Sequence, residues 1–410
     1  MKRVMAFALA GGRTRGLSVL SQPRSVAAVP FAGKFRLIDF TLSNCVNSEI
    51  SDIAVLAQYA PLSLAQHLGR GEPWDLDRRD GGVQILQPYA RQEGARWYEG
   101  TADALRQNLD VIENSGAERV FLLSSDLIYK MDYSWMLQHH LDSGAKVTLA
   151  VGNVPYGETA RFGMVKADET GRIEEFVEKP AVTAARLAFM GVYLFDAPFL
   201  KRILLETRGA NLILDVLMPF IHDASLVRVY PFGGYWDDVG SLPHYFRAHQ
   251  RLLGEDPAPN LYDHGWRIFT RSEEMPPVVF HESAEVVDSL VSNGAVIAGR
   301  VERSVLSPGV HIGPGAVVRD AVLLNGTYIG PGAVVERTVI DKNVMVGGGA
   351  KVGRIDADAT CGCPEFEGIA LVGKWARIAD GARVEPGVVV APGEPRPEVE
   401  HCARIGEGAL

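Results

Sequence analysis

The first 255 residues alternate short apolar runs with longer amphipathic segments. The short runs have the length and the turn boundaries of buried strands. The amphipathic segments repeat apolar residues at steps of three and four, as Leu105, Leu109 and Ile112 do, which predicts helices. Strands and helices in alternation predict an α/β domain with a mostly parallel sheet. Strands are expected at Val4–Leu9, Asp52–Leu56, Arg119–Leu123 and Val147–Val151, and helices at Phe40–Val46 and Asp103–Asn114.

The last part of the chain has a different period. An apolar residue followed by a glycine-rich corner recurs at Ile312, Ile329 and Val346, which are 17 residues apart. Within each unit, apolar positions fall about six residues apart. Short strands with glycine at the corners are typical of a parallel β-helix, whose coils bury their apolar side chains only against neighbouring coils. We therefore expect a C-terminal parallel β-helix of hexapeptide-like repeats.

Two proline-rich breaks separate these regions. One is 256–260 and the other is 275–277, and each contains two prolines. Proline interrupts helices and strands alike, so such clusters mark boundaries. A chain of 410 residues is also longer than one hydrophobic core usually serves. We expect an α/β domain over residues 1–255, a linker over 256–283 and the β-helix domain over 284–410.

Charge and cysteine content limit the possible partners and the compartment. Lys and Arg number 41 against 50 Asp and Glu, a net charge of −9, which argues against nucleic acid as a partner. No apolar run approaches the ~20 residues of a membrane span. The apolar start of the chain runs straight into a glycine loop, as a buried strand does, so we do not expect a signal peptide. Four cysteines suggest a reducing compartment, with Cys361 and Cys363 as incidental thiols, and we expect a cytoplasmic protein.

A glycine pair follows the first expected strand. Gly11 and Gly12 are succeeded by Arg13 and Arg15. Backbone N–H groups can approach an anion where glycine leaves no side chain in the way, and α/β proteins bind phosphates in this manner. Because a glycine pair after a strand is common, this motif alone is weak evidence.

Six longer motifs then follow in a fixed order. They are Ala28–Ser48, Trp97–Ala104, Ser125–Lys130, Phe162–Val165, Phe176–Pro180 and Tyr235–Gly240. Together with the glycine loop they closely resemble bacterial glucose-1-phosphate adenylyltransferase, over nearly the whole chain. The resemblance implies an α/β domain of the nucleotide-diphospho-sugar transferase type and a left-handed β-helix. It also implies an enzyme of glycogen synthesis that converts ATP and glucose 1-phosphate into ADP-glucose and pyrophosphate.

The chemistry of this reaction identifies the groups that matter. An oxygen of the sugar phosphate attacks the α-phosphorus of ATP, so catalysis consists of positioning and of neutralising negative charge. The resemblance implies that Asp126 and Asp238, not Asp237, bind Mg²⁺, which prefers carboxylate oxygens and retains several waters. Arg13 and Arg15 would neutralise phosphate charge in the loop.

The resemblance also implies the binding residues. Lys179 would hold the sugar phosphate and Glu178 a sugar hydroxyl, with Tyr98 and Gly163 lining the sugar site. The nucleotide-binding positions would be Gln58, which contacts the adenine, and Gly11, Gly12, Gly100 and Asp103.

The chain departs from the family pattern near both substrates. The family loop reads Gly-Gly-Arg-Gly-Thr-Arg-Leu, whereas Thr14 here replaces a glycine and Gly16 an arginine. Val26 replaces a phosphate-binding lysine and Phe189 a small hydroxyl residue that contacts the sugar. The segment 211–217, with an apolar run at 212–214, replaces a family segment rich in His, Asp and Lys. Loss of one charge stabiliser commonly lowers a rate ~10² to 10³-fold, so these changes predict weakened catalysis.

Three interpretations follow. The first is an adenylyltransferase in which Arg13 and Arg15 supply the missing charge, and the second is a non-catalytic regulatory subunit that partners an active paralogue. The third, an acyltransferase with His311 as base, is rejected because His311 sits beside a core position of the repeat. The family resemblance further implies a tetramer, homomeric or mixed, and flat solenoid faces commonly meet other subunits.

Overall fold

The computed structural model describes residues 3–12, 14–91, 94–95, 97–353 and 364–394. Contacts divide the chain into two compact units. The first comprises Met1–Phe31 and Phe35–Ser272, and the second comprises Glu273–Leu410 with Ala32–Lys34. Residues 256–272, which were expected in a linker, therefore pack with the first unit. No helix among the described residues is long and apolar enough to cross a membrane.

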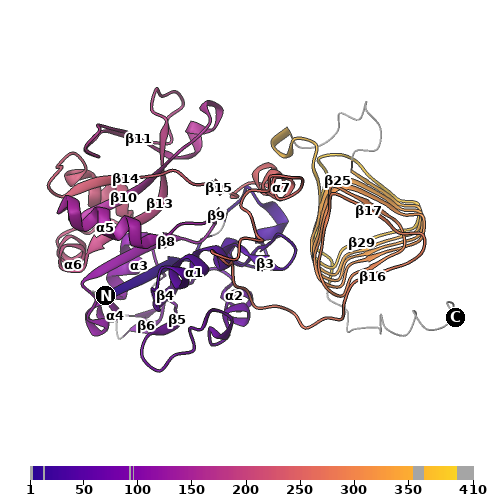
Figure 1. Cartoon of the computed structure of the whole chain (residues 1–410), viewed down its shortest axis with the longest axis horizontal. Helices are drawn as coiled ribbons and strands as arrows, with labels where there is room; N and C mark the ends of the chain where they lie inside the picture. The colour runs from indigo at the N-terminus through magenta and orange to yellow at the C-terminus, as the bar shows by residue number, and fades with distance from the viewer. Residues whose placement is uncertain (1–2, 13, 92–93, 96, 354–363, 395–410) are drawn as a thin grey trace. The chain divides into compact units, whose positions relative to one another are not determined.

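The first unit is built on a nine-stranded sheet (Figure 1). Its centre is parallel, in the order β8 (Arg119–Ser124), β1 (Val4–Leu9), β4 (Asp52–Leu56) and β5 (Gly82–Leu86). Antiparallel pairing enters with β13 (Leu187–Asp196), which joins β8 to the rest of the sheet. The remaining strands are β10 (Val147–Asn153), β11 (Gly163–Ala167), β12 (Ile173–Glu178) and β14 (Val227–Phe232). The expected α/β class is confirmed.

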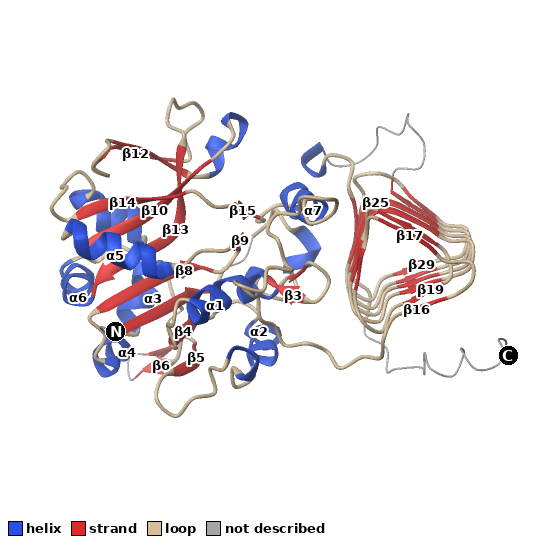
Figure 2. Cartoon of the chain, viewed as in Figure 1, coloured by secondary structure: helices blue, strands red, loops and turns tan. Residues whose placement is uncertain are grey.

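Helices cover both faces of this sheet, as Figure 2 shows in blue. Successive side chains of a strand point to opposite faces, so Met5 and Phe7 join one core while Ala6 and Ala8 join the other. The first core also contains residues of α3, α4 and α6, and the second contains residues of α1, α2 and α5. The helices are α1 (Leu37–Asn47), α2 (Pro61–Leu68), α3 (Thr101–Gln107), α4 (Leu109–Ser115), α5 (Tyr133–Ser143), α6 (Ala197–Glu206) and α7 (Leu242–Gln250).

One helix expected from the sequence is two helices. The expected Asp103–Asn114 is divided at Asn108, whose φ of −121° is not helical. The Asn108 amide donates to Ala104 O at 2.8 Å and to the Tyr98 hydroxyl at 3.1 Å. Asparagine side chains compete with the helix in this way because they can bond nearby backbone groups. Leu105 and Ile112 are nevertheless buried on the same face, as their spacing predicts.

The second unit is a stack of parallel strands in two long ladders (Figure 1). Ile312, Ile329 and Val346 pair in register, so each 17-residue interval is one coil. The interior is apolar and buried, as the repeat predicts. One ladder is β16 (Val279–Phe280), β19 (Val296–Ile297), β22 (His311–Ile312), β24 (Tyr328–Ile329), β26 (Met345–Val346) and β29 (Arg377–Ile378). The other is β17 (Glu285–Val287), β20 (Arg300–Glu302), β23 (Val317–Leu323), β25 (Val334–Ile340), β27 (Lys351–Gly353) and β30 (Arg383–Val384).

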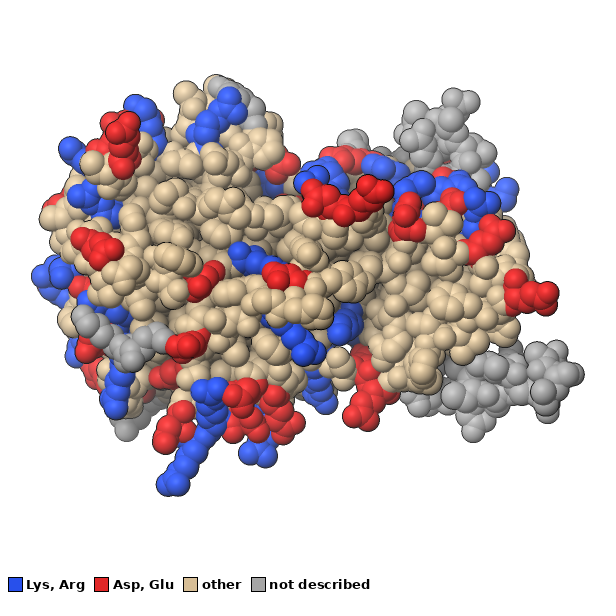
Figure 3. Space-filling view, viewed as in Figure 1, with Lys and Arg blue, Asp and Glu red and all other residues tan. Residues whose placement is uncertain are grey.

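Glycine at the coil corners has a steric reason. A Cβ on Gly330 would lie 2.7 Å from Gly348 N of the next coil, closer than any side chain tolerates. Lys and Arg lie next to Asp and Glu on the surface (Figure 3), although Asp341 of this unit is buried. Of the cysteines, Cys45 is buried with a free thiol, and Cys361, Cys363 and Cys402 lie outside the described residues.

Candidate active site

A pocket of about 260 Å³ opens in the first unit beside the carboxyl end of β8. This is the edge of a parallel sheet at which α/β proteins usually bind ligands, because loops diverge there. Five residues expected from four separate motifs line it together. They are Asp126, Gly163, Glu178, Lys179 and Asp238.

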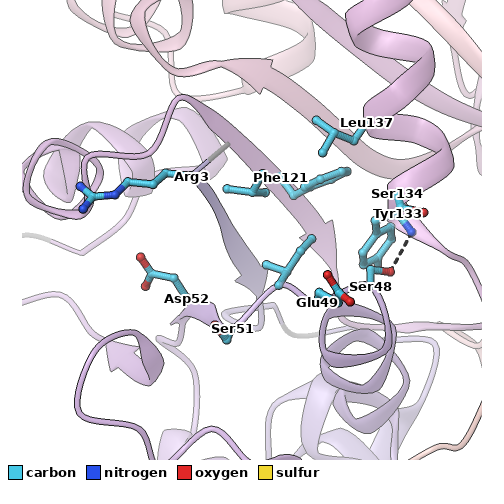
Figure 4. Close-up of a pocket in the computed structure, with 11 residues that line it drawn as sticks. Arg3, Ser48, Glu49, Ser51, Asp52, Phe121, Tyr133, Ser134 and Leu137 are labelled. Carbon is cyan, nitrogen blue, oxygen red and sulfur yellow. Dashed lines mark hydrogen bonds between the residues drawn. The ribbon is translucent and has the colours of Figure 1, made fainter. Parts of the chain in front are cut away.

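A second pocket, of about 180 Å³, lies at the amino ends of β1 and β4 (Figure 4). Ser48 closes one side of it and accepts a hydrogen bond from Tyr133 N at 2.8 Å. Asp52, also in its lining, has a pKa raised by burial. None of the residues expected to bind substrate lines this pocket, so the pocket beside β8 is the candidate active site.

Two carboxylates are brought together by a short strand pair. β9 (Leu127–Tyr129) and β15 (Trp236–Asp238) are antiparallel, with Asp238 opposite Leu127, so Asp238 lies next to Asp126. Burial, and then the negative charge of Asp238, raise the pKa of Asp126 to about 6. The Ser124 hydroxyl donates to Asp126, and Gly240 N donates to Asp238 Oδ1 at 2.7 Å. Two carboxylates held against their own repulsion form a donor set for a divalent cation.

These two side chains fit a metal that phosphates complete. Among the described residues, no group of three His, Cys, Asp or Glu side chains could hold a metal ion by itself. Mg²⁺ typically takes only one or two protein carboxylates and fills its remaining positions with substrate phosphates and water. Asp126 and Asp238 therefore suit Mg²⁺ that binds together with a nucleotide.

Arg161 is a residue of the pocket that sequence reasoning missed. Its Nη2 donates to Asp238 O at 2.7 Å and lies 3.4 Å from Asp238 Oδ2, while Nη1 pairs with Glu158 at 2.7 Å. The guanidinium lies 5.0 Å from the Phe162 ring centroid. A fixed positive charge therefore sits beside the carboxylate pair. The sequence signal that could have identified Arg161 is its position directly before the Phe162–Val165 motif.

Asp237 differs from its neighbour. Residues alternate in direction along a strand, and Asp237 is not in the pocket lining whereas Asp238 is. Burial is the main cause that raises the pKa of Asp237 to about 7, and the Arg161 charge opposes it. The Tyr235 hydroxyl lies 3.5 Å from Asp237 Oδ2.

Close packing at Gly163 positions the side chains of Glu178 and Lys179. Gly163 is opposite Glu178 in the β11–β12 pair, and a Cβ on Gly163 would lie 2.9 Å from Glu178 Oε2. A side chain at position 163 would therefore displace the Glu178 carboxylate and the Phe176 ring. Lys179 has a φ of +47°, unusual for a residue with a side chain, and its N–H donates to Phe162 O at 3.0 Å. Lys179 Nζ lies 3.6 Å from Glu178 Oε1.

Four expected substrate residues gather next to this pocket instead of in its lining. The Gln58 side chain makes two hydrogen bonds with the Tyr98 backbone. Tyr98 N donates to Gln58 Oε1 at 2.7 Å, and Gln58 Nε2 donates to Tyr98 O at 3.3 Å. Gly100 packs on the Ala210 backbone, where a Cβ would come within 2.5 Å of Ala210 O. Thr101, the next residue, does line the pocket and so connects the two groups.

Asp103 is the fourth of these residues. It is buried at the start of α3, and its Oδ2 accepts from Glu99 N at 3.1 Å and from Gln107 Nε2 at 2.8 Å. The carboxylate therefore orders the turn that leads into the helix, as a capping residue does.

The reordered glycine loop has its own geometry. The Thr14 hydroxyl donates to Gly240 O at 3.0 Å and accepts from Gly16 N at 3.2 Å. A Cβ on Gly16 would lie 2.4 Å from Gly240 O, and Leu242 N donates to Gly16 O at 2.8 Å. The glycine that moved to position 16 thus lets the loop touch the segment that carries Asp238.

The other loop positions differ in exposure. Gly12 faces open space and a Cβ on Gly11 would make ordinary contact with Gln58. Arg15 is exposed and outside the pocket lining, and Val26 is buried. Arg13 lies outside the described residues.

The structure thus defines an α/β protein with a carboxylate pair and a lysine in one pocket at the carboxyl edge of its sheet. Comparison with known families agrees. The nucleotidyl transferase family model matches residues 5–255, and the model for a GlmU-like C-terminal hexapeptide region matches residues 277–372.

Curated relatives are more specific. Glucose-1-phosphate adenylyltransferase of Geobacillus stearothermophilus is 46% identical over 324 residues, covering 78% of this chain and 84% of the relative. The protein of that name from Clostridium perfringens strain SM101 is 44% identical over 330 residues, with coverages of 78% and 84%. The one from Thermotoga neapolitana is 45% identical over 328 residues, with coverages of 78% and 77%. The chain belongs to the glucose-1-phosphate adenylyltransferase family of nucleotidyl transferases, which confirms the resemblance found in the sequence.

Proposed function

We propose that this chain transfers the adenylyl group of ATP to glucose 1-phosphate and releases pyrophosphate. The observation that carries the proposal is the meeting of Asp126 and Asp238 in the pocket that Glu178 and Lys179 also line. Two anions react there, so the site needs fixed positive charge and a metal-binding carboxylate pair. The family relationship makes this reaction the expected one.

Asp126 and Asp238 would hold Mg²⁺, which when bound neutralises the charge that builds on the leaving pyrophosphate. Arg161 keeps Asp238 in place through its bond to the Asp238 carbonyl. Ser124 does the same for Asp126 by donating to its carboxylate. Because these side chains are held before substrate arrives, little reorganisation is needed during the reaction.

Lys179 is the proposed contact to the phosphate of the sugar. Its backbone conformation is unfavourable for a lysine, and such strain is often kept at functional positions. The side chain is 63% exposed and can move toward an arriving anion. Glu178, beside it, can accept hydrogen bonds from sugar hydroxyls because Gly163 leaves room for its carboxylate.

The nucleotide would lie between the glycine loop on one side and Gln58 with the turn at Gly100 on the other. Gly11, Gly12, Gln58, Gly100 and Asp103 stay proposed nucleotide-site positions, and Tyr98 a proposed sugar-site position. Arg13 and Arg15 remain the proposed charges of the loop. Weakened catalysis, expected from Val26 and Gly16, also stays a prediction.

We further propose that the chain assembles as a tetramer, homomeric or mixed with a paralogue. What supports this is an outer row of the solenoid in which Val296, His311, Tyr328 and Met345 stack in register. Light scattering of the purified chain checks the homomeric form, which requires four times the monomer mass of 44.5 kDa.

The deciding experiment is pyrophosphate release by the purified chain with ATP, Mg²⁺ and glucose 1-phosphate, alongside calorimetric ATP binding. Turnover that Asp126→Asn abolishes is the expected result. ATP binding without turnover would instead support the non-catalytic regulatory subunit, which the enzyme names of the relatives do not favour.

A further inference from the structure

The glycine loop and the carboxylate of Asp238 meet at one residue, Gly240. The Gly240 N–H donates to Asp238 Oδ1 at 2.7 Å, and the Gly240 carbonyl accepts from the Thr14 hydroxyl at 3.0 Å. A Cβ on Gly240 would lie 2.9 Å from Asp238 Oδ1, so the carboxylate packs directly against this backbone. Gly240 thus joins the loop that is proposed to hold phosphates to a carboxylate that is proposed to hold the metal.

Thr14 also fixes the shape of the loop. Its hydroxyl accepts from Gly16 N at 3.2 Å while it donates to Gly240 O, so both hydrogen-bonding functions of the hydroxyl are used. The Thr14 carbonyl accepts from the Ser21 hydroxyl at 2.7 Å. A glycine at position 14, as in the family loop, has no hydroxyl and could not make the contact with Gly240.

Gly16 makes this contact sterically possible. Leu242 N donates to Gly16 O at 2.8 Å, which holds the loop against the backbone that follows Gly240. A Cβ at position 16 would lie 2.4 Å from Gly240 O and 3.1 Å from Ser241 Cα, and neither backbone atom can rotate away. An arginine at this position, as in the family loop, would therefore push the loop off Gly240. Thr14 supplies the hydrogen bond, and Gly16 leaves the room that the bond requires.

A second series of contacts holds the same segment. The Ser241 hydroxyl lies 2.7 Å from His244 Nδ1, and His244 Nε2 lies 3.0 Å from Glu158 Oε2. Glu158 pairs with Arg161, whose Nη2 donates to Asp238 O at 2.7 Å. Asp238 is therefore fixed by two series of contacts, and the one through Gly240 reaches the glycine loop.

We infer that Thr14 and Gly16 are positioning residues that couple nucleotide binding at the glycine loop to Mg²⁺ binding at Asp238. The inference rests on the proposed function, which assigns phosphates to the loop and the metal to the carboxylate pair. A nucleotide that orders the loop also orders the Thr14 hydroxyl and, through Gly240, the Asp238 carboxylate. Each ligand then raises the affinity for the other by the same factor, because such coupling is reciprocal. The reordered loop has exchanged a cation for a hydrogen bond to the metal-binding segment.

The test measures ATP binding to the full chain by calorimetry, with and without Mg²⁺. The ratio of the two dissociation constants reports the coupling. Thr14→Val keeps the branched shape and removes the hydroxyl, so this ratio should fall about 5-fold, the size of one hydrogen bond. Thr14→Ser, which keeps the hydroxyl, should retain most of the ratio. An unchanged ratio in Thr14→Val would overturn the inference.

Two further variants separate positioning from loop stability. Ser21→Ala is the matched control, because it removes a hydrogen bond to Thr14 O that does not involve Gly240, and it should leave the ratio unchanged. An equal fall in Ser21→Ala and Thr14→Val would overturn the coupling and leave Thr14 a structural residue. In an Asp238→Asn background, Thr14→Val should have no further effect on the ratio, since the carboxylate that the loop positions is gone.

Gly16→Arg distinguishes position from charge. It restores the cation of the family loop, yet kcat/KM for pyrophosphate release should fall about 10²-fold because the loop must leave Gly240. A rise in rate would overturn the inference and show that charge is what the loop lacks. Thr14→Val adds no bulk, so the calorimetric test does not depend on whether position 16 tolerates a side chain. No pyrophosphate release by the wild-type chain would overturn the proposed adenylyl transfer, and the calorimetric ratio would still decide the coupling.

Discussion

The pocket of the first unit and the solenoid of the second use charged residues in opposite ways. In the first unit, burial raises the pKa of Asp126 to about 6 and that of Asp237 to about 7. In the solenoid, hydrogen bonds from Arg319 and Arg300 lower the pKa of Glu302. The first unit thus holds carboxylates whose ionised form is disfavoured by burial. The solenoid holds a carboxylate whose ionised form is favoured by arginine hydrogen bonds.

The difference separates binding from stability. Carboxylates that repel each other in a half-buried pocket oppose folding, and a bound cation removes that opposition. The solenoid has an apolar interior, and its charges pair on the surface, as Arg319 does with Glu302 at 2.7 Å and Glu336 at 3.4 Å. Its stability should therefore depend on apolar packing and hardly on charge.

The largest expected effect concerns the carboxylate pair of the pocket. Asp238→Asn removes one of the two proposed metal carboxylates and should lower kcat/KM for pyrophosphate release about 10³-fold. Asp237→Asn is the matched control, because Asp237 lies outside the pocket lining, and it should cost less than about 10-fold. A larger loss in Asp237→Asn than in Asp238→Asn would mean that the metal carboxylate is misassigned.

The next effect concerns a buried titratable group of the first unit. His249 is fully buried, and burial lowers its pKa to about 4, so the unfolded chain binds a proton below pH 6.5 that the folded chain excludes. Stability from this residue is present above pH 6.5 and falls by about 1.4 kcal/mol per pH unit toward pH 4. His249→Phe should remove that slope from denaturant unfolding curves. His264→Gln, at an exposed histidine, should retain it, and equal slopes in wild type and His249→Phe would refute the assignment.

A smaller effect tests the apolar interior of the solenoid. Val335→Ala creates a cavity at a fully buried position of β25 and should lower the free energy of unfolding by about 2 kcal/mol. Val334→Ala, one residue earlier on the same strand, changes a side chain that is only partly buried and should cost less than half as much. Similar losses in both variants would show that interior packing does not dominate this unit.

The smallest expected effect concerns the surface charges of the solenoid. Glu302→Gln removes the partner of Arg300 and Arg319. Because exposed ion pairs contribute little and salt screens them, the thermal midpoint should change only slightly, and the change should vanish in 1 M NaCl. A large, salt-independent drop would mean that the ladder of charges stabilises the coils after all.

Some features were predictable because their causes are local. The strand at Val4–Leu9 follows from apolar composition bounded by turn residues, and the coil length follows from the 17-residue repeat of Ile312, Ile329 and Val346. The family could be recognised because its motifs are contiguous stretches of sequence. In contrast, the break at Asn108 depends on the hydroxyl of Tyr98, which lies ten residues away on another segment.

The sequence by itself determined the α/β class, the solenoid and the family, since each is written in a periodicity or in contiguous residues. The resemblance implied that Asp126 and Asp238 share a site, but only the tertiary structure decided how they meet, because the β9–β15 pairing joins segments more than 100 residues apart. It also decided that Arg161 stands beside them and that Gly16 must lack a side chain to contact Gly240. These facts depend on how closely distant backbones approach, and no local pattern of residues encodes that distance.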